Sequence, residues 1–271
     1  MRPTTPTPSA EALAQQLSLH SFAPVSLTDV VDRADLATRV DRKYFVDLDT
    51  LGRLTESLTD SHRVLEVDGR RATSYATTYF DTPEFASCRA HIQRRRRRWK
   101  VRSRLYVEDD LCRVEVKTKS GRGETLKAAL VSHADRYGIL DDTDRDFVAH
   151  SLAHAHPEVD IADLAPRAEI TYTRACLADL DNGTRLTIDW QLRSVLREGR
   201  VRADEAYAIV ETKGGQVPAA ADRILASFGA PPRSFSKYVA TASLVHPDIA
   251  DNDVRGLRGT QLHCSPLNHA N

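Results

Sequence analysis

A dense run of positive charge that passes into strict alternation constrains the fold of this chain more than any other feature. Residues 94–104 contain eight arginines and lysines and no acidic residue. From residue 99 the charged and apolar side chains alternate, and the alternation resumes over residues 112–119 after the acidic turn 108–110. A period of two is typical of a β-strand with one polar and one apolar face. The sequence therefore predicts a hairpin whose polar face is basic on both strands.

A basic sheet face can meet solvent or bind an anion. One face of an antiparallel sheet is often solvated, but such a face usually mixes charges with neutral polar residues. Like charges on neighbouring strands destabilise a sheet, so a uniformly cationic face favours a bound polyanion. The whole chain is balanced, with 38 basic and 38 acidic residues, so the positive charge is local. We therefore expect a groove or a lumen rather than a surface that coats nucleic acid or an anionic membrane.

The spacing of the cysteines and the hydropathy of the chain bear on disulfides, zinc sites and membrane segments. The four cysteines lie far apart in the sequence and form no CxxC pair, so neither a zinc ribbon nor a disulfide framework is indicated. The N-terminus has no apolar core of a signal peptide, and no run of about 18 apolar residues occurs. We expect reduced thiols, no membrane segment and a cytoplasmic location.

Periodicity and turn residues predict an α+β fold with about eight strands. We expect a disordered segment over residues 1–20, one domain over 21–246 and a flexible tail over 247–271. Strands that are polar on one face and apolar on the other suit an antiparallel β-barrel with a charged lumen and helices packed outside. The strands are expected at 39–46, 63–67, 73–81, 99–107, 112–119, 167–177, 185–191, 192–196 and 206–213. The helices are expected at 26–36, 49–59, two turns after 82–84, 132–156, 217–228 and 235–245.

Several residues could bind phosphate or metal. The chain has no Walker P-loop spacing, so side chains would have to hold any phosphate, and arginine suits this because its planar fork takes two oxygens. Glu211 shares a strand face with Lys213, and Glu115 lies beside Lys117. Each carboxylate could form a salt bridge in a cationic lumen or hold a hard divalent metal, and the sequence leaves both open. Ser236 and Lys237 open a helix, which could hold a phosphate or be an ordinary cap.

A histidine pattern allows a second kind of metal site. His150, His154 and His156 have the spacing HxxxHxH, which could bind zinc. We favour the alternative that these histidines form the polar end of a helix.

Seven motifs in a fixed order resemble a known family. They are RVDRKYFV (39–46), YFDTPEF (79–85), KVRSRLY (100–106), VEVKTK (114–119), YTR (172–174), IVETKG (209–214) and FSKY (235–238). This set is similar to the VTC polyphosphate polymerase domain, which belongs to the CYTH, or triphosphate tunnel metalloenzyme, superfamily. The resemblance covers about residues 39–245 and implies an antiparallel β-tunnel with a charged lumen.

The resemblance also implies roles for residues at matching positions. Glu211 would hold a catalytic Mn or Mg ion, with Glu115 as a second candidate. Ser236 and Lys237 would bind phosphate at the end of the tunnel. Lys100 and Lys213 lie on the same strand faces and would also bind substrate. The triphosphate would be gripped by Lys43, Arg102, Arg104, Lys117, Lys127 and Arg174.

Two positions depart from the superfamily pattern. The strand that reads ExExK in the superfamily has Arg39, Asp41 and Lys43 here, as VTC-like members do, which argues against a simple triphosphatase. Arg174 and Glu169 have opposite parity, so both can face a lumen only if the strand carries a bulge. We expect Arg174 to face the lumen.

The function implied by the resemblance is ATP-dependent synthesis of polyphosphate, in which the γ-phosphoryl group passes to a growing chain. A hydrolase of the same fold that cleaves triphosphate, polyphosphate or a nucleoside triphosphate is the nearer alternative. A non-catalytic module that binds polyphosphate or RNA is the more distant one. Aromatic residues are only 6% of the chain and Trp99 falls on the apolar parity, which disfavours base stacking. We therefore expect ATP and polyphosphate as partners, and no nucleic acid.

Overall fold

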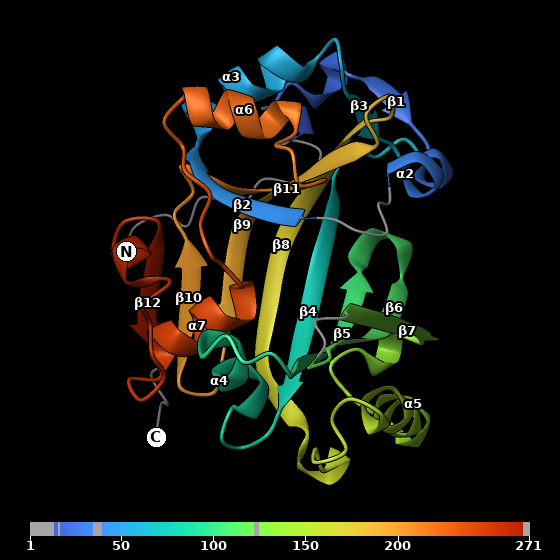
Figure 1. Cartoon of the computed structure of the whole chain (residues 1–271), viewed down its shortest axis with the longest axis vertical. Coiled ribbons are helices and arrows are strands. Elements are labelled where there is room, and N and C mark those ends of the chain that lie inside the picture. Colours follow the sequence, from blue (N-terminus) through green and yellow to red (C-terminus); the bar gives the residue numbers. More distant parts are fainter. Residues whose placement is uncertain (1–13, 16, 35–39, 122–124, 268–271) are drawn as a thin grey trace, which may run out of the picture. The chain divides into compact units, whose positions relative to one another are not determined.

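The computed structural model describes residues 14–15, 17–34, 40–121 and 125–267. The chain forms two compact units, each assembled from segments that are far apart in the sequence (Figure 1). Unit 1 comprises Met1–Ser74, Thr173–Gln191 and Glu205–Ser234. Unit 2 comprises Tyr75–Tyr172, Leu192–Asp204 and Phe235–Asn271. Strands β8 (Ala165–Asp179) and β9 (Thr184–Val195) contribute residues to both units.

Unit 1 is built on strands in the order β2-β11-β9-β8-β3-β1. The registered pairs are antiparallel except β1 with β3, which run parallel. Its other elements are η1 (Leu19–Ser21), β1 (Ala23–Val25), α2 (Leu27–Ala34), β2 (Val40–Asp47), α3 (Leu48–Leu58), β3 (Arg63–Leu65), β11 (Tyr207–Gly214) and α6 (Ala220–Ser227).

Helices cover the apolar face of unit 1. Tyr44 and Val46 of β2 and Val210 of β11 are buried against leucines of α3 and α6. In Figure 1, α3 and α6 lie side by side next to β2 and β11. The Asp47 carboxylate accepts a hydrogen bond from the Thr50 amide at 2.6 Å and caps α3. Because side chains alternate along a strand, Lys43 and Glu211 lie on the opposite face.

Unit 2 follows the strand order β12-β10-β9-β8-β4-β5-β6-β7. Its helices are α4 (Ala86–Ile92), α5 (Asp142–Ala153) and α7 (Lys237–Val245). Its strands, besides parts of β8 and β9, are β4 (Thr73–Asp81), β5 (Arg98–Tyr106), β6 (Leu111–Lys119), β7 (Thr125–Ser132), β10 (Gly199–Ala203) and β12 (Leu262–Pro266). Short 3₁₀ turns occur at η2 (Val107–Asp109), η3 (Ala134–Arg136), η4 (Ile161–Asp163) and η5 (Arg255–Leu257).

The basic hairpin is strands β5 and β6, and its two faces differ as predicted. Arg102 lies opposite Glu115 and Lys100 lies opposite Lys117. On the other face Trp99, with 5% exposure, joins Val116 in a core with Val148 of α5. The apolar face is therefore packed by a helix, and the basic face is left for other contacts.

The α+β class and the antiparallel sheet are confirmed, but the described strands do not close into a hydrogen-bonded barrel. Among the described residues β1, β2, β7 and β12 each have a single strand neighbour, so these pairs do not form the closed ring that we expected. The free edge of β2 is partly covered by coil, because the Arg233 amide donates to the Lys43 carbonyl at 2.7 Å. Covering an exposed strand edge in this way is a common alternative to closure.

Several elements differ from the sequence-based prediction. Residues 125–132 form β7, and the helix expected over 132–156 is the shorter α5. The two strands expected over 185–196 are one strand, β9, in which Gln191 has a left-handed φ of 55°. The expected tail carries η5 and β12, and β12 pairs with β10.

The N-terminal predictions are only partly covered by the structure. Most of the segment expected to be disordered, residues 1–13 and 16, lies outside the described residues, as do the end of the helix expected at 26–36 and Arg39 of the first strand motif. Leu17 and Leu19 are described and are buried in unit 1. No helix in the described part of the chain has the length and apolar character needed to span a membrane. Cys88, Cys112, Cys176 and Cys264 are free thiols.

Candidate functional site

The expected site residues fall into two groups, one in each unit. Within each strand the site residues lie on one face, because alternate side chains point to the same side of a sheet. In unit 2, Lys100, Arg102 and Arg104 lie on β5, Glu115 and Lys117 on β6, Lys127 on β7, Ser236 at the N-cap of α7 and Lys237 at its first position. In unit 1, Lys43 lies on β2, Arg174 on β8, and Glu211 and Lys213 on β11.

The group in unit 2 is centred on Arg102. Its guanidinium donates from Nε to Glu115 Oε2 at 2.5 Å and from Nη1 to the Tyr79 hydroxyl at 3.1 Å. Both partners face Arg102 because β5 lies between β4 and β6 with Tyr79 and Glu115 in register with it. Arg104 Nη1 lies 3.8 Å from the same Glu115 carboxylate. We call Tyr79, Lys100, Arg102, Arg104 and Glu115 the Arg102 cluster.

Two further lysines extend the Arg102 cluster across the sheet. Lys117 lies directly opposite Lys100 on one side and Lys127 on the other. Like charges in directly opposed positions destabilise a sheet. The strands therefore hold cations in a row at an energetic cost that a bound polyanion would offset.

The cations of the Arg102 cluster favour ionisation of the acidic groups beside them. Burial raises the pKa of Glu115, but Arg102 and Arg104 outweigh it and lower that pKa to about 2. Burial also opposes ionisation of the Tyr79 phenol, yet Arg102, Lys100 and Arg104 lower its pKa to about 8. Tyr79 is only 7% exposed, so its hydroxyl lies inside this cationic environment.

The start of α7 contacts the Arg102 cluster through Lys100. Lys100 Nζ donates to Ser236 Oγ at 2.9 Å, and Ser236 makes no side-chain cap bond to its own helix. The ammonium of Lys237 lies 4.6 Å from the centre of the Tyr172 ring, a cation–π contact. A helix start, a hydroxyl and two ammonium groups therefore meet here, which is an arrangement that can hold a phosphate.

A buried carboxylate fixes α7 against the cluster. Asp81 is fully buried and accepts hydrogen bonds from the Ser87 hydroxyl and the Tyr238 hydroxyl, each at 2.8 Å. Tyr238 of α7 stacks on Tyr79 with ring centres 4.7 Å apart and an interplanar angle of 5°. Burial, together with the Asp81 charge, raises the pKa of the Tyr238 phenol well above its usual range, so the phenol remains a donor.

The group in unit 1 is centred on Glu211. Its Oε1 lies 3.4 Å from Lys43 Nζ and its Oε2 lies 3.8 Å from Lys213 Nζ. Burial lowers the pKa of Lys213 to about 8, although the Glu211 charge opposes this. We call Lys43, Glu211, Lys213 and Arg174 the Glu211 cluster.

Arg174 is oriented by a partner that sequence reasoning did not identify. Its Nε and Nη2 donate to the two oxygens of Asp189 at 2.5 and 2.7 Å. Asp189 is fully buried, so this forked pair fixes the guanidinium plane. Tyr79 and Asp81 were also missed, and the only sequence signal for them was their place in the YFDTPEF motif.

The two glutamates differ in how well they fit a divalent metal. Glu211 keeps 14% side-chain exposure and lies beside the flexible side chains of Lys43 and Lys213, so it fits a hard ion that takes its other ligands from phosphate oxygens and water. Glu115 is held by Arg102 and Arg104, which is the salt-bridge alternative that the sequence left open.

A metal site made of protein ligands alone is not seen in the described residues, where no three His, Cys, Asp or Glu side chains gather to hold an ion. Of the histidines considered for zinc, His156 is buried and pairs with Glu158 at 3.3 Å, whereas His150 and His154 are exposed.

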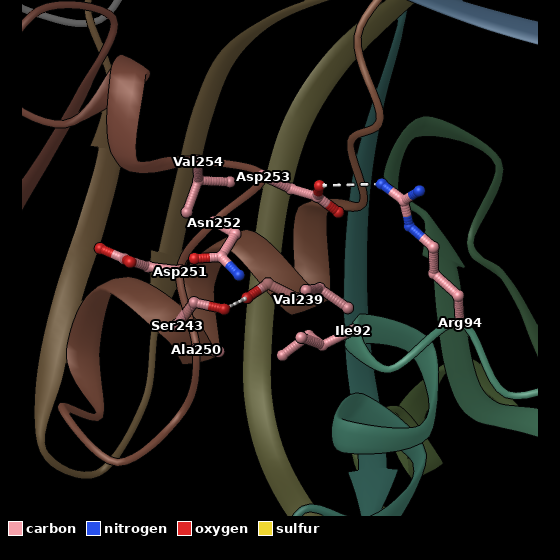
Figure 2. A pocket seen from close by; sticks show the side chains of 9 residues that line it. All are labelled: Ile92, Arg94, Val239, Ser243, Ala250, Asp251, Asn252, Asp253 and Val254. Carbon is pink, nitrogen blue, oxygen red and sulfur yellow. Dashed lines mark hydrogen bonds and ion pairs between the residues drawn. The ribbon is translucent and has the colours of Figure 1, made fainter.

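A separate pocket lies at the surface of unit 2, beside α7 (Figure 2). It has a volume of about 180 Å³ and is lined by Ile92, Arg94, Val239, Ser243 and residues 250–254. None of these is among the residues expected to bind phosphate.

Comparison with known proteins identifies a family by sequence. The sequence profile of the family described as VTC domain matches residues 38–246. No curated protein is a significant sequence match.

Solved structures resemble the chain over about three quarters of its length. A proposed adenylate cyclase of Bacillus halodurans has 16% identity and a TM-score of 0.44, with 73% of this chain and 93% of that chain covered. A proposed adenylyl cyclase of Hippeastrum, described as having a dominant triphosphatase activity, has 14% identity and a TM-score of 0.48, with 76% and 96% covered. The PH1012 protein of Pyrococcus horikoshii has 10% identity and a TM-score of 0.38, with 71% and 88% covered.

Proposed function

The chain belongs to the VTC domain family, and on this premise we propose that it is an ATP-dependent polyphosphate polymerase. The reaction would transfer the γ-phosphoryl group of ATP to the end of a polyphosphate chain and release ADP. The observation that supports it most is the Arg102 cluster together with Lys117 and Lys127, where cations on three adjacent strands accompany the Glu115 carboxylate. Such a surface suits a linear chain of phosphates better than a single anion.

The cations would do most of the catalytic work. Arg102, Arg104 and Lys117 in unit 2, and Arg174 in unit 1, are the residues that we propose as catalytic, and each would stabilise negative charge on phosphate groups. The forked Asp189 pair would aim Arg174, and Glu115 would aim Arg102. The acceptor is a phosphate oxygen that is already ionised at neutral pH, so no general base is required. Positioning and charge stabilisation therefore account for the chemistry.

The remaining cations would bind the substrate and product chains. Ser236 and Lys237 would hold a phosphate at the start of α7, with Lys100 on the same hydroxyl. The other lysines of this set, Lys43, Lys127 and Lys213, would contact further phosphates.

A divalent metal is implied by the family resemblance, and Glu211 would hold it. When bound, Mn²⁺ or Mg²⁺ would neutralise charge on the phosphate oxygens. Lys43 and Lys213 lie 3.4 and 3.8 Å from the Glu211 carboxylate and would contribute positive charge beside the phosphate.

Product analysis tests the proposal against its alternatives. The purified protein is incubated with ATP and Mn²⁺, and polyphosphate, ADP and free phosphate are separated. A polymerase yields ADP and polyphosphate. A hydrolase of the same fold yields ADP and free phosphate, and a binding module yields neither. The pairs Arg102–Glu115 and Arg174–Asp189 favour an enzyme over a binding module, since they fix arginines in defined orientations.

A further inference from the structure

The run of five arginines over residues 94–98, which leads into β5, lies outside the site described above. Residues 93–97 link α4 to β5 and are exposed. Two of the arginines tie this link to the body of unit 2. Arg94 pairs with Asp253 at 3.7 Å, as Figure 2 shows, and Arg97 pairs with Glu158 at 2.9 Å. The aliphatic part of Arg97 also lies against Gly121 at the end of β6. The link is therefore held in place by ion pairs.

The other arginines of the run have no acidic partner in the described part of the chain. Arg95 donates to the neutral Gln93 side chain at 2.7 Å, and Arg98 donates to the Arg95 carbonyl at 3.2 Å. Lys119 of β6 lies directly opposite Arg98, so a like charge faces it. We call Arg95, Arg96, Arg98 and Lys119 the arginine edge.

The arginine edge continues the Arg102 cluster along the same strands. Arg98 lies on the same face of β5 as Lys100, Arg102 and Arg104. Lys119 lies on the same face of β6 as Lys117 and Glu115. Successive cations on one face of a strand are about 6.6 Å apart, since each residue rises about 3.3 Å. Exposure increases along the row, from 8% at Arg104 to the exposed link that carries Arg95 and Arg96. A chain of phosphates bound at Arg102 would thus meet the next cations without a gap.

We propose that the arginine edge is a second binding surface for polyphosphate, which holds the part of the chain that extends beyond the Arg102 cluster. This inference rests on the proposed function for the identity of the polymer. Arginine suits the role because its fork takes two phosphate oxygens and stays charged at any physiological pH.

Single-stranded nucleic acid fits the arginine edge less well. Proteins that bind single strands usually add aromatic side chains on which bases stack. Residues 94–98 contain no aromatic residue, and the neighbouring Trp99 is buried on the opposite face against α5. Polyphosphate has charge at every unit and no bases, which matches a surface of arginines alone.

A binding experiment without nucleotide tests the proposal. The double variant Arg95→Ala/Arg96→Ala is compared with the wild type for the affinity of long-chain polyphosphate and of tripolyphosphate at several salt concentrations. We expect long-chain affinity to fall about tenfold, with the salt slope reduced by about 0.7 for each arginine that contacts phosphate. Tripolyphosphate affinity should be unchanged, because a three-phosphate ligand is held at the Arg102 cluster.

Arg197→Ala/Arg200→Ala is the matched control, since both arginines are exposed in the same unit, Arg197 in the turn after β9 and Arg200 near the start of β10. The proposal would be overturned if the control lost as much long-chain affinity as the edge variant, or if the edge variant kept its long-chain affinity. It would also be overturned if the edge variant lost as much affinity for tripolyphosphate as for long-chain polyphosphate. A single-stranded RNA that binds more tightly than polyphosphate and loses more in the edge variant would also overturn it. This experiment measures binding and not turnover. Failure of the polymerase proposal would be seen in a different experiment, as an absence of polymer product from ATP.

Discussion

At the Tyr79 hydroxyl, a phenol and three cations share one small region of unit 2. The pKa of Tyr79 is about 8 in the ligand-free protein, because Arg102, Lys100 and Arg104 outweigh the effect of burial. A bound polyphosphate would neutralise these cations, so the pKa of the phenol would rise toward its usual value near 10. Binding would therefore take up a proton, and affinity must fall as pH rises through about 8.

The affinity for tripolyphosphate, which we place at the Arg102 cluster, should therefore fall by up to one decade per pH unit between the free and bound pKa values of Tyr79. In Tyr79→Phe this titration is gone, so most of the pH dependence that Tyr79 contributes should be lost. Titration calorimetry of both proteins from pH 7 to 9 measures the slopes, and an identical slope in the variant would show that Tyr79 is not linked to binding.

The Glu211 carboxylate decides between an enzyme and a binding module. Glu211→Gln keeps the shape of the side chain but removes the charge that holds a hard cation. We expect ATP turnover to fall on the order of a hundredfold or more, as for loss of one stabilising group in phosphoryl transfer. Metal-free polyphosphate affinity should be kept or increase, because a negative charge leaves a cationic cluster. Undiminished turnover would assign Glu211 to ion pairing with Lys43 and Lys213 only.

Among the elements, α7 depends on one buried hydrogen bond for its position. Tyr238→Phe removes the donor to Asp81 but keeps the ring that stacks on Tyr79. A hydrogen bond to a charged group contributes about 1.5–3 kcal/mol, so the free energy of unfolding should fall by about that amount. Because Ser236 and Lys237 start this helix, tripolyphosphate affinity should also fall several-fold.

Ser243→Ala is the control for this change, since its hydroxyl bonds only within α7, to the Val239 carbonyl. Denaturant unfolding and tripolyphosphate titration of both variants provide the comparison. If Tyr238→Phe lowers stability but leaves affinity unchanged, Asp81 serves the fold and does not position the phosphate site.

Strands with a marked composition or alternation were predictable, since β4 is rich in Thr and Tyr and β5 carries a charge at every second position, whereas β7 and β12 were missed. β5 follows from Lys100, Arg102 and Arg104 alternating with apolar residues, and α7 follows from its position after a turn. β7 has no clean alternation in its sequence TLKAALVS, and it is a strand because β6 pairs with it. β12 is short and polar at its end, and it is defined by its pairing with β10.

The partners of the site residues could not be predicted, because they depend on register. Asp189 meets Arg174 across 15 residues, and Tyr79 meets Arg102 only because β4 and β5 align them. Neither pairing leaves a local signal in the sequence.

For the molecule as a whole, substrate binding should appear as thermal stability. Tripolyphosphate binds only the native state, so it stabilises the protein by about 2.7 kcal/mol at a hundred times its Kd. A thermal scan with millimolar tripolyphosphate should therefore show a raised Tm, and the rise should shrink at high salt because exposed cations are screened. Equal concentrations of sodium sulfate provide the control for ionic strength. No rise beyond this control would count against any phosphate site.

The balance of products over time tests the central claim most directly. With ATP and Mn²⁺, each ADP released should be matched by one phosphate unit recovered in polymer, with little free phosphate at any time. Radiolabelled γ-phosphate follows this balance, and digestion of the polymer by an exopolyphosphatase confirms its identity. Release of ADP matched by free phosphate, with no labelled polymer from the first turnovers onward, would contradict the account and assign these clusters to hydrolysis.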